Sequence, residues 1–210
     1  VVAIWVSAQR PDEKRIGKTT YRITQVLQDV TGKFKADSEL VLDRFRSGKP
    51  GDRFLILATR GETVEWGSPL EATPELIEYI VGVPRGKPGA QRLPYFMKFL
   101  EHSQESIADD AFAEFANAPF KEIATLTDQF PREKLHKWVT DPATRVNRLG
   151  VYGMMLGMCG RAEDAVAMEK KILEPVAKDS FRLGIDGIVA GYLLLTKVQG
   201  LEKLEKEKLK

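Results

Sequence analysis

The chain of 210 residues has few histidines and cysteines, which are common metal ligands and catalytic side chains. It contains two histidines, His102 and His136, and a single cysteine, Cys159. Neither histidine belongs to a spacing that zinc sites use, so we interpret both as helix-capping or surface residues. Cys159 ends an apolar run, where a cysteine is usually a small buried hydrophobic residue. A single cysteine excludes a disulfide within the chain.

Four carboxylates lie close together in the sequence, between residues 105 and 114. On a helix, Glu105 and Asp109 would share one face, and Asp110 and Glu114 would share another. Paired carboxylates can act as general acid and base, but we interpret both pairs as solvated surface residues. The sequence contains no P-loop, no G-x-S-x-G motif and no G-x-G-x-x-G motif after a strand. We therefore expect no catalytic residues, no cofactor and no metal.

The beginning of the chain is basic, although the formal net charge of the whole is only +2. Residues 1–60 have 12 Lys and Arg against 7 Asp and Glu, with Tyr21, Phe34 and Phe45 among the charges. Basic side chains interleaved with aromatic ones can bind an anionic polymer, while a solvated surface is the simpler alternative. The candidate binding residues are Arg22, Lys33, Lys35, Arg44, Arg46 and Arg53.

A segment of the second half is repeated 34 residues later: residues 148–157 read RLGVYGMMLG and residues 182–191 read RLGIDGIVAG. Arg, Leu and three glycines recur in register, which indicates a structural repeat. The glycines of each copy lie at i, i+3 and i+7, on one face of a helix, where each costs roughly 1 kcal/mol relative to alanine. We expect the close approach of another helix to compensate. The candidate packing residues are Gly150, Gly153, Gly157, Gly184, Gly187 and Gly191.

Small residues on a helix face also occur where transmembrane helices cross. The apolar stretch over residues 183–195 is shorter than the roughly 20 residues that a span needs, and it contains Asp186. We therefore predict buried helices and no membrane span. Arg182 and Asp186 stand at i and i+4 in the second copy, which predicts an ion pair between them.

The elements that would position these residues differ between the two ends of the chain. Stretches rich in β-branched, aromatic and apolar residues, separated by turn residues, predict five strands in the first 66 residues. A helix should follow, with Thr73 as its N-cap and Pro74 as its first residue. Short antiparallel strands of this kind predict a small barrel that the helix flanks or plugs. The expected strands cover residues 1–8, 19–30, 40–45, 53–59 and 63–66.

Helical periods replace the strand pattern from Leu93 onward, after a stretch that two prolines and two glycines mark as a linker. We predict a β-barrel domain over residues 1–84, a linker over 85–91 and a helical domain over 92–210, hence the α+β class. Short turns predict antiparallel neighbours. The expected helices cover residues 93–101, 105–117, 120–129, 132–140, 145–159, 162–173, 181–195 and 201–210.

Residues 93–115 have the pattern of an apolar helix, a tight turn and a second helix with alanines at its packing positions. Residues 144–150 and 180–184 place a basic residue near the start of a helix. In these features the chain resembles the HEAT and armadillo class of α-solenoids over about residues 92–200, with glycine where the class usually has alanine. The resemblance implies stacked helical hairpins. The last helix would then be a cap with Leu201, Leu204 and Leu209 facing inward.

Residues 20–28 and 51–57, together with Trp66 ahead of the Thr73 helix, resemble the netrin-like or OB-type barrels of some exported bacterial proteins. Netrin-like inhibitors act through cysteines that this chain lacks, so inhibition is not implied. The sequence begins in a strand pattern without an initiator methionine. We therefore expect a preceding signal peptide and a periplasmic or extracellular location, with the cytoplasm as the alternative.

Together these features predict a non-enzymatic protein that binds another protein through a helical-repeat surface. The alternative is an oligosaccharide- or oligonucleotide-binding module that uses the basic barrel face, with a glycan favoured over nucleic acid because the net charge is small. A third hypothesis is an enzyme with a site between the two domains. The residues that would converge there are Trp66, Arg92, Tyr95 and His102.

Overall fold

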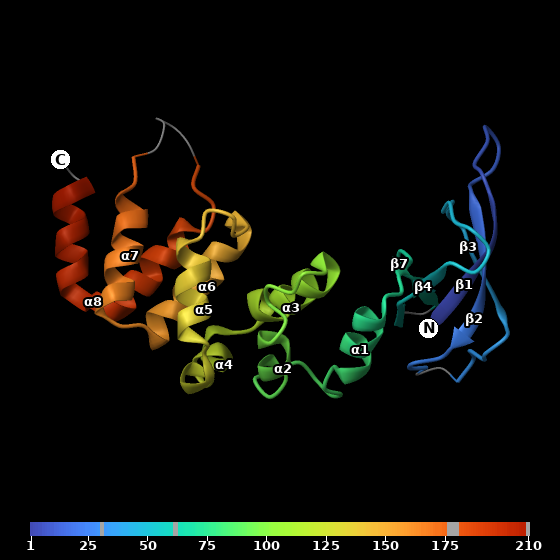
Figure 1. Ribbon diagram of the computed structural model, residues 1–210, viewed down its shortest axis with the longest axis horizontal. Coiled ribbons are helices and arrows are strands. Elements are labelled where there is room, and N and C mark those ends of the chain that lie inside the picture. The colour runs from blue at the N-terminus through green and yellow to red at the C-terminus, as the bar shows by residue number, and fades with distance from the viewer. Residues whose placement is uncertain (30–31, 61–62, 176–180, 209–210) are drawn as a thin grey trace. The chain divides into compact units, whose positions relative to one another are not determined.

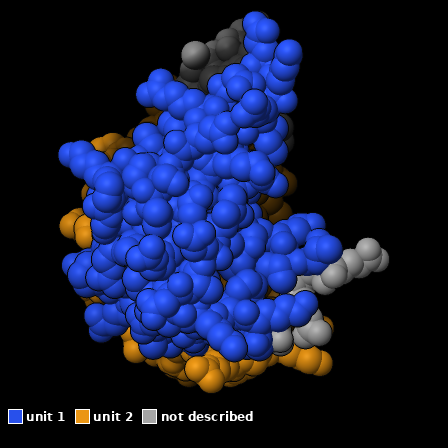
Figure 2. Space-filling model, turned by 90° about the vertical axis from the view of Figure 1, so that its right-hand side faces the viewer, with its two compact units in different colours: residues 1–83 blue, residues 84–210 orange. Residues whose placement is uncertain are grey.

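The structure is a computed structural model that describes residues 1–29, 32–60, 63–175 and 181–208 (Figure 1). The predicted α+β class is confirmed, since strands come first in the chain and helices follow. The chain divides into two compact units, residues Val1–Val83 and residues Pro84–Lys210, which Figure 2 shows in different colours. Each unit has buried hydrophobic side chains of its own.

Unit 1 contains one larger and one smaller antiparallel sheet. The larger sheet has the strand order β3-β2-β1-β4-β7, and the smaller one pairs β5 with β6. The strands are β1 (Val2–Gln9), β2 (Lys18–Gln25), β3 (Glu39–Leu42), β4 (Arg53–Leu55), β5 (Ala58–Arg60), β6 (Val64–Trp66) and β7 (Leu70–Glu71).

The prediction of a closed five-stranded barrel is wrong for the part of unit 1 that the structure describes. A barrel requires its outermost strands to pair, but β3 and β7 stay at opposite edges of an open sheet. The stretch 53–59 explains the difference, because it is not one strand. Leu55 pairs with Val2 in the larger sheet, whereas Ala58 pairs with Trp66 in the smaller one.

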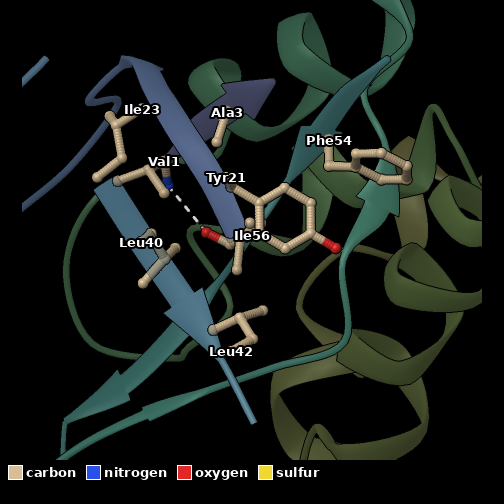
Figure 3. Packing of buried hydrophobic residues seen from close by; sticks show 8 residues of the cluster. All are labelled: Val1, Ala3, Tyr21, Ile23, Leu40, Leu42, Phe54 and Ile56. Atoms are coloured by element: carbon tan, nitrogen blue, oxygen red, sulfur yellow. Dashed lines mark hydrogen bonds between the residues drawn. The ribbon is translucent and has the colours of Figure 1, made fainter. Parts of the chain in front are cut away.

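The core of unit 1 lies against one face of the larger sheet, where buried and exposed positions alternate along β2 and β3. The amino group of Val1 donates a hydrogen bond to the Ile56 carbonyl at 2.9 Å, drawn as a dashed line in Figure 3. The core residues shown there are Val1, Ala3, Tyr21, Ile23, Leu40, Leu42, Phe54 and Ile56. Helix α1 (Pro74–Gly82) begins as predicted, since the Thr73 hydroxyl accepts the Leu76 N–H at 3.1 Å.

Unit 2 is helical in its described part. The predicted bounds are confirmed for the helices over residues 105–117, 132–140 and 162–173, whereas the helix predicted over 120–129 is divided into α4 and a short 3₁₀ helix, Thr127–Gln129. The helices are α2 (Leu93–Met97), α3 (Glu105–Asn117), α4 (Phe120–Ala124), α5 (Arg132–Thr140), α6 (Val146–Cys159), α7 (Ala162–Leu173) and α8 (Ile185–Lys208).

The last two predicted helices form one element, α8, whose helical path is interrupted at Lys197 (φ 54°, ψ −137°). Gly200, which lies in the gap between the two predicted helices, is within α8, and a Cβ atom built on it would collide with Thr196 and Tyr192. Leu201, expected to face inward, is largely exposed. Leu209 lies outside the described residues. Within unit 2, α6 packs against α8, and α7 packs against α8 as well (Figure 1).

Candidate functional site

The predicted packing glycines lie where α6 meets α8. A Cβ atom built on Gly153 would be 2.8 Å from the Ile188 Cα, which is closer than side chains approach a backbone. A Cβ atom on Gly157, Gly187 or Gly191 would overlap the backbone of the opposite helix. At these positions, only glycine permits the observed approach of α6 and α8.

The first glycine of each copy behaves differently. A Cβ atom on Gly150 would meet its nearest neighbour, the Gly184 Cα, at 3.5 Å, an ordinary contact. Gly184 does not share a helical face with Gly187 and Gly191, because α8 begins after it and its φ is +79°. Glycine is favoured at Gly184 for this left-handed backbone. The two copies of the repeat therefore differ in backbone conformation at their first glycine, although their sequences match there.

The first arginine of the repeat, Arg148, is 2% exposed and joins α6 to the segment that follows α2. Its Nη1 donates to the Leu100 carbonyl at 2.9 Å and to Glu101 Oε1 at 2.8 Å. The Tyr152 hydroxyl donates to the same carboxylate at 2.6 Å. Burial first, and the neighbouring Glu101 carboxylate second, raise the pKa of Tyr152, so this phenol remains a hydrogen-bond donor.

The second arginine, Arg182, also binds backbone carbonyls of a preceding element. Its Nη1 donates to the Ile172 carbonyl at 2.9 Å, and its Nη2 donates to the Lys171 carbonyl. Both carbonyls lie in the last turn of α7, where a positive charge is favourable. The predicted ion pair between Arg182 and Asp186 is absent from the described structure, because the guanidinium is directed to α7.

We expected the carboxylates between residues 105 and 114 to be solvated, but three of them bind arginines. Glu105 and Asp109 of α3 both accept hydrogen bonds from Arg145. Asp109 also accepts one from Arg148 Nη2 at 2.5 Å, and Glu114 forms an ion pair at 3.3 Å with an arginine that precedes α2. These contacts use the carboxylates to hold α3 against its neighbours.

A buried carboxylate that the sequence did not single out, Asp164, lies in the first turn of α7. It is 0% exposed and accepts hydrogen bonds from the Arg161 N–H at 2.7 Å and from Arg132 Nε at 2.7 Å. His136 Nδ1 lies 2.6 Å from its other oxygen, so this histidine bridges two helices and does more than line a surface. A carboxylate three residues after an N-cap, as in a capping box, was the available signal.

The pKa of Asp164 lies below its usual value despite its burial. Burial alone would raise this pKa, but the hydrogen bonds from the Arg161 N–H, His136 and Arg132 favour the charged form more strongly. Asp164 is therefore the charged centre of a cluster that joins α5 to α7.

The other predicted chemistry-bearing residues have local roles. His102 Nδ1 accepts the Gln104 N–H at 3.1 Å, next to the start of α3. Burial, followed by the charge of Asp164, raises the pKa of the Cys159 thiol to about 11, so the thiol is protonated at neutral pH. Within residues 1–29, 32–60, 63–175 and 181–208, no group of three metal-ligating side chains occurs. No helix of that part combines the length and apolarity that a membrane span needs.

The residues considered for a site between domains take part in contacts of their own units. Tyr95 stacks with Phe99 at a ring-centroid distance of 5.1 Å, and Phe99 lies 6.0 Å from the His102 ring. Arg92 forms its ion pair with Glu114. Trp66 belongs to unit 1, where it packs against Phe34 at 4.9 Å.

The six basic candidates of the predicted basic face come from three places in the chain of unit 1. Arg22 and Arg53 are both paired with Ile4 across neighbouring strands, so their side chains lie on one face of the sheet. Tyr21 and Phe54, their neighbours in sequence, face the core on the opposite side. Arg22 and Arg53 therefore lie on that outer face. Lys33 and Lys35 lie between β2 and β3, and Arg44 and Arg46 follow β3.

Apolar side chains are exposed on the last helices of unit 2. Val198 is 67% exposed, Leu201 46% and Leu194 45%, all within one segment of α8. Val198 and Leu201 follow the break at Lys197 and lie at i and i+3, so they share a face. On its side toward α7, α8 borders a groove of about 540 Å³. Residues that line this groove include Val166, Glu169, Leu195, Gln199 and Lys203.

Comparison with known proteins identifies no relative of this chain: no family model, curated protein or solved structure matches it. The likeness to HEAT-type repeats and to netrin-like or OB-type barrels therefore rests on sequence features alone. What the molecule does has to be inferred from its contacts and surfaces.

Proposed function

We propose that this chain is a non-enzymatic protein that binds another protein through its helical unit. The observation that carries the proposal is the exposed apolar face of α8 that Val198 and Leu201 form, with Leu194 exposed as well before the break at Lys197. Isolated exposed apolar residues are ordinary, but several on one segment are typical of an interaction surface. Burying them in an interface would remove apolar area from water, which stabilises a complex.

The packing of unit 2 supports a scaffold of stacked helices. α6 carries the first copy of the repeat and α8 carries the second from Ile185 onward, and the two helices pack directly against each other, as equivalent helices of neighbouring solenoid repeats do. The glycine contacts between them fix this approach. We therefore propose a HEAT- or armadillo-like arrangement for this unit, with the α8 face as its binding surface.

The buried ion pairs of unit 2 connect its helices, which supports a structural role for these ionisable side chains. Arg148 connects α6 to α3, and Asp164 connects α7 to α5. Such clusters hold elements in one arrangement, and removing one member of a buried pair is strongly destabilising. A helical stack held in this way presents a fixed surface to a partner.

The test uses the full chain and a matched pair of double variants. The immobilised chain is used to recover partners from an extract of its source, and a purified partner is then titrated. We expect Val198→Ser with Leu201→Ser to weaken binding by about tenfold or more, since each loses buried apolar area. Val41→Ser with Ile16→Ser, which removes exposed apolar side chains of unit 1, is the control.

Equal binding by both double variants would contradict the proposed surface. Failure to recover any partner, together with substrate turnover by the intact chain, would overturn the proposed function in favour of an enzyme. Retention of the chain on polysaccharide or nucleic-acid resin at low salt would support the alternative, an oligosaccharide- or oligonucleotide-binding unit 1. That alternative has less support, because the six basic residues occupy three separate places.

A further inference from the structure

Two of the basic side chains, Arg44 and Arg46, extend from a backbone segment that is fixed from several sides. The Thr19 hydroxyl, which is fully buried, donates to the Arg44 carbonyl and accepts the Arg46 N–H, both at 2.8 Å. The Trp5 indole N–H donates to the Arg46 carbonyl at 3.0 Å. The positions of both arginine Cα atoms are therefore set by two partly buried hydrogen bonds and one exposed one.

Among the described residues, the guanidinium groups of these two arginines contact neutral partners. Arg44 donates to the Ser68 hydroxyl at 3.0 Å and to the Trp66 carbonyl at 2.9 Å, while Arg46 lies over the Phe54 ring at 4.9 Å. Neither guanidinium is within ion-pair distance of any carboxylate that the structure describes. The adjacent Asp43 pairs with a lysine instead, at 3.4 Å.

The arginines of unit 2 show the contrasting behaviour. Several of them bond to carboxylates, and these bonds hold helices together. An arginine held in place without a carboxylate keeps its charge and several N–H donors available to a ligand. The paired arginines are Arg92 with Glu114, Arg132 with Asp164, Arg145 with Asp109, and Arg148 with Glu101.

The Tyr21 hydroxyl is a third donor at the same place. Tyr21 is 0% exposed, and its hydroxyl has no hydrogen-bond partner in the described structure. The nearby Thr19 hydroxyl already donates its proton to a carbonyl. The Tyr21 and Phe54 rings meet edge to face at a centroid distance of 5.6 Å, and the Arg46 guanidinium lies over the same Phe54 ring, so Arg46 and Tyr21 are neighbours. Burial raises the pKa of Tyr21, and the charge of Arg46, the Thr19 hydroxyl and the charge of Arg44 oppose this rise. The cluster thus combines three donors, and no carboxylate of the described residues pairs with them.

We propose that Arg44 and Arg46, backed by Tyr21, bind a single oxyanion of the phosphate or sulfate class. Planar guanidinium groups match the geometry of such oxygens, and a phenol donates to them readily. An extended polyanion fits less well, because the other basic candidates lie on the opposite sheet face or in the β2–β3 segment. The Tyr21 hydroxyl is buried, so it can reach a bound oxygen only if side chains around it move.

The site is tested by calorimetric titration of the full chain at constant ionic strength. The probes are inorganic phosphate, inorganic sulfate and glycerol 3-phosphate, with chloride as the reference ion. We expect saturable binding of at least one probe and its loss in the Arg44→Gln/Arg46→Gln variant. The matched control is Arg22→Gln/Arg53→Gln, which removes the same charge from the opposite face and should bind within about twofold of the wild type.

Tyr21→Phe gives an independent readout. Loss of a hydrogen bond to a charged group should weaken oxyanion binding by about tenfold. The same variant should not lower the unfolding temperature of the anion-free chain, because it removes a buried hydroxyl that has no partner. Saturable binding of the phosphate ester alone indicates an esterified ligand, and binding of inorganic phosphate indicates a free one; both support the site. An absence of saturation with every probe, or equal losses in the two double variants, would overturn it.

Discussion

The contact of Gly153 with α8 permits a quantitative prediction for the variant Gly153→Ala. The new Cβ would lie 2.8 Å from the Ile188 Cα and 2.9 Å from its Cγ1. Carbon atoms pack best at about 3.5–4.0 Å, so α6 and α8 must separate by roughly 0.7 Å or more. Overpacking of this kind costs about 1–3 kcal/mol, against a gain of up to about 1 kcal/mol from the helix propensity of alanine. We expect a net destabilisation of up to about 2 kcal/mol, and a stability about 1–3 kcal/mol below that of an alanine variant without the collision.

Gly150→Ala is the matched control, because it makes the same change on the same helix. Its Cβ would meet the nearest neighbour at 3.5 Å, so the propensity gain is retained without a collision. This variant should be as stable as the wild type or up to about 1 kcal/mol more stable. Urea denaturation followed by far-UV circular dichroism measures both changes, and thermal midpoints should differ by about 2–4 °C for each kcal/mol.

The result that would refute this reasoning is equal stability of the two alanine variants. It would mean that α6 and α8 do not approach closely at Gly153, or that they separate at no cost. A loss of stability in Gly150→Ala as large as in Gly153→Ala would refute it too, since a general intolerance of alanine in α6 would then explain both.

Three further predictions concern buried polar groups. Thr19→Val should cost about 1–3 kcal/mol in urea denaturation, because the Arg44 carbonyl and the Arg46 N–H lose their partner. Arg148→Met should cost about 1.5–3 kcal/mol in the same assay, through lost charged hydrogen bonds. The folded pKa of Asp164 is depressed, so its contribution is full above the unfolded value of about 4 and is lost as pH falls below it. Stability measured from pH 5 to pH 2 should therefore decline more steeply in the wild type than in Asp164→Asn.

Local patterns in the sequence were sufficient for much of the secondary structure. The N-cap at Thr73 and the helical periods of α3, α5 and α7 depend on neighbouring residues only, and the structure has these elements as predicted. The supposed barrel failed because sheet closure depends on which strands pair at the edges. A continuous apolar run such as residues 53–59 does not reveal that its two ends pair in different sheets.

The spacing of residues along the sequence did not predict which charged side chains form pairs. The i, i+4 rule predicted a pair between Arg182 and Asp186, yet Arg182 caps α7. Arg132 and Asp164 are 32 residues apart, and Arg148 and Asp109 are 39 apart. Such pairs form only because helix packing brings distant turns together, so no short window of sequence contains both members.

The partners of each arginine also decide how the excess of basic residues at the beginning of the chain is interpreted. A count of charges over residues 1–60 treats all arginines alike, and the candidates drawn from it come from three places in unit 1. The structure sorts them by partner and by face. Arg44 and Arg46 are held by neutral groups beside an unpaired phenol, whereas Arg145 and Arg148 neutralise carboxylates. An arginine fixed by neutral contacts retains its charge for a ligand, so the missing acceptor, more than the excess of positive charge, indicates an oxyanion.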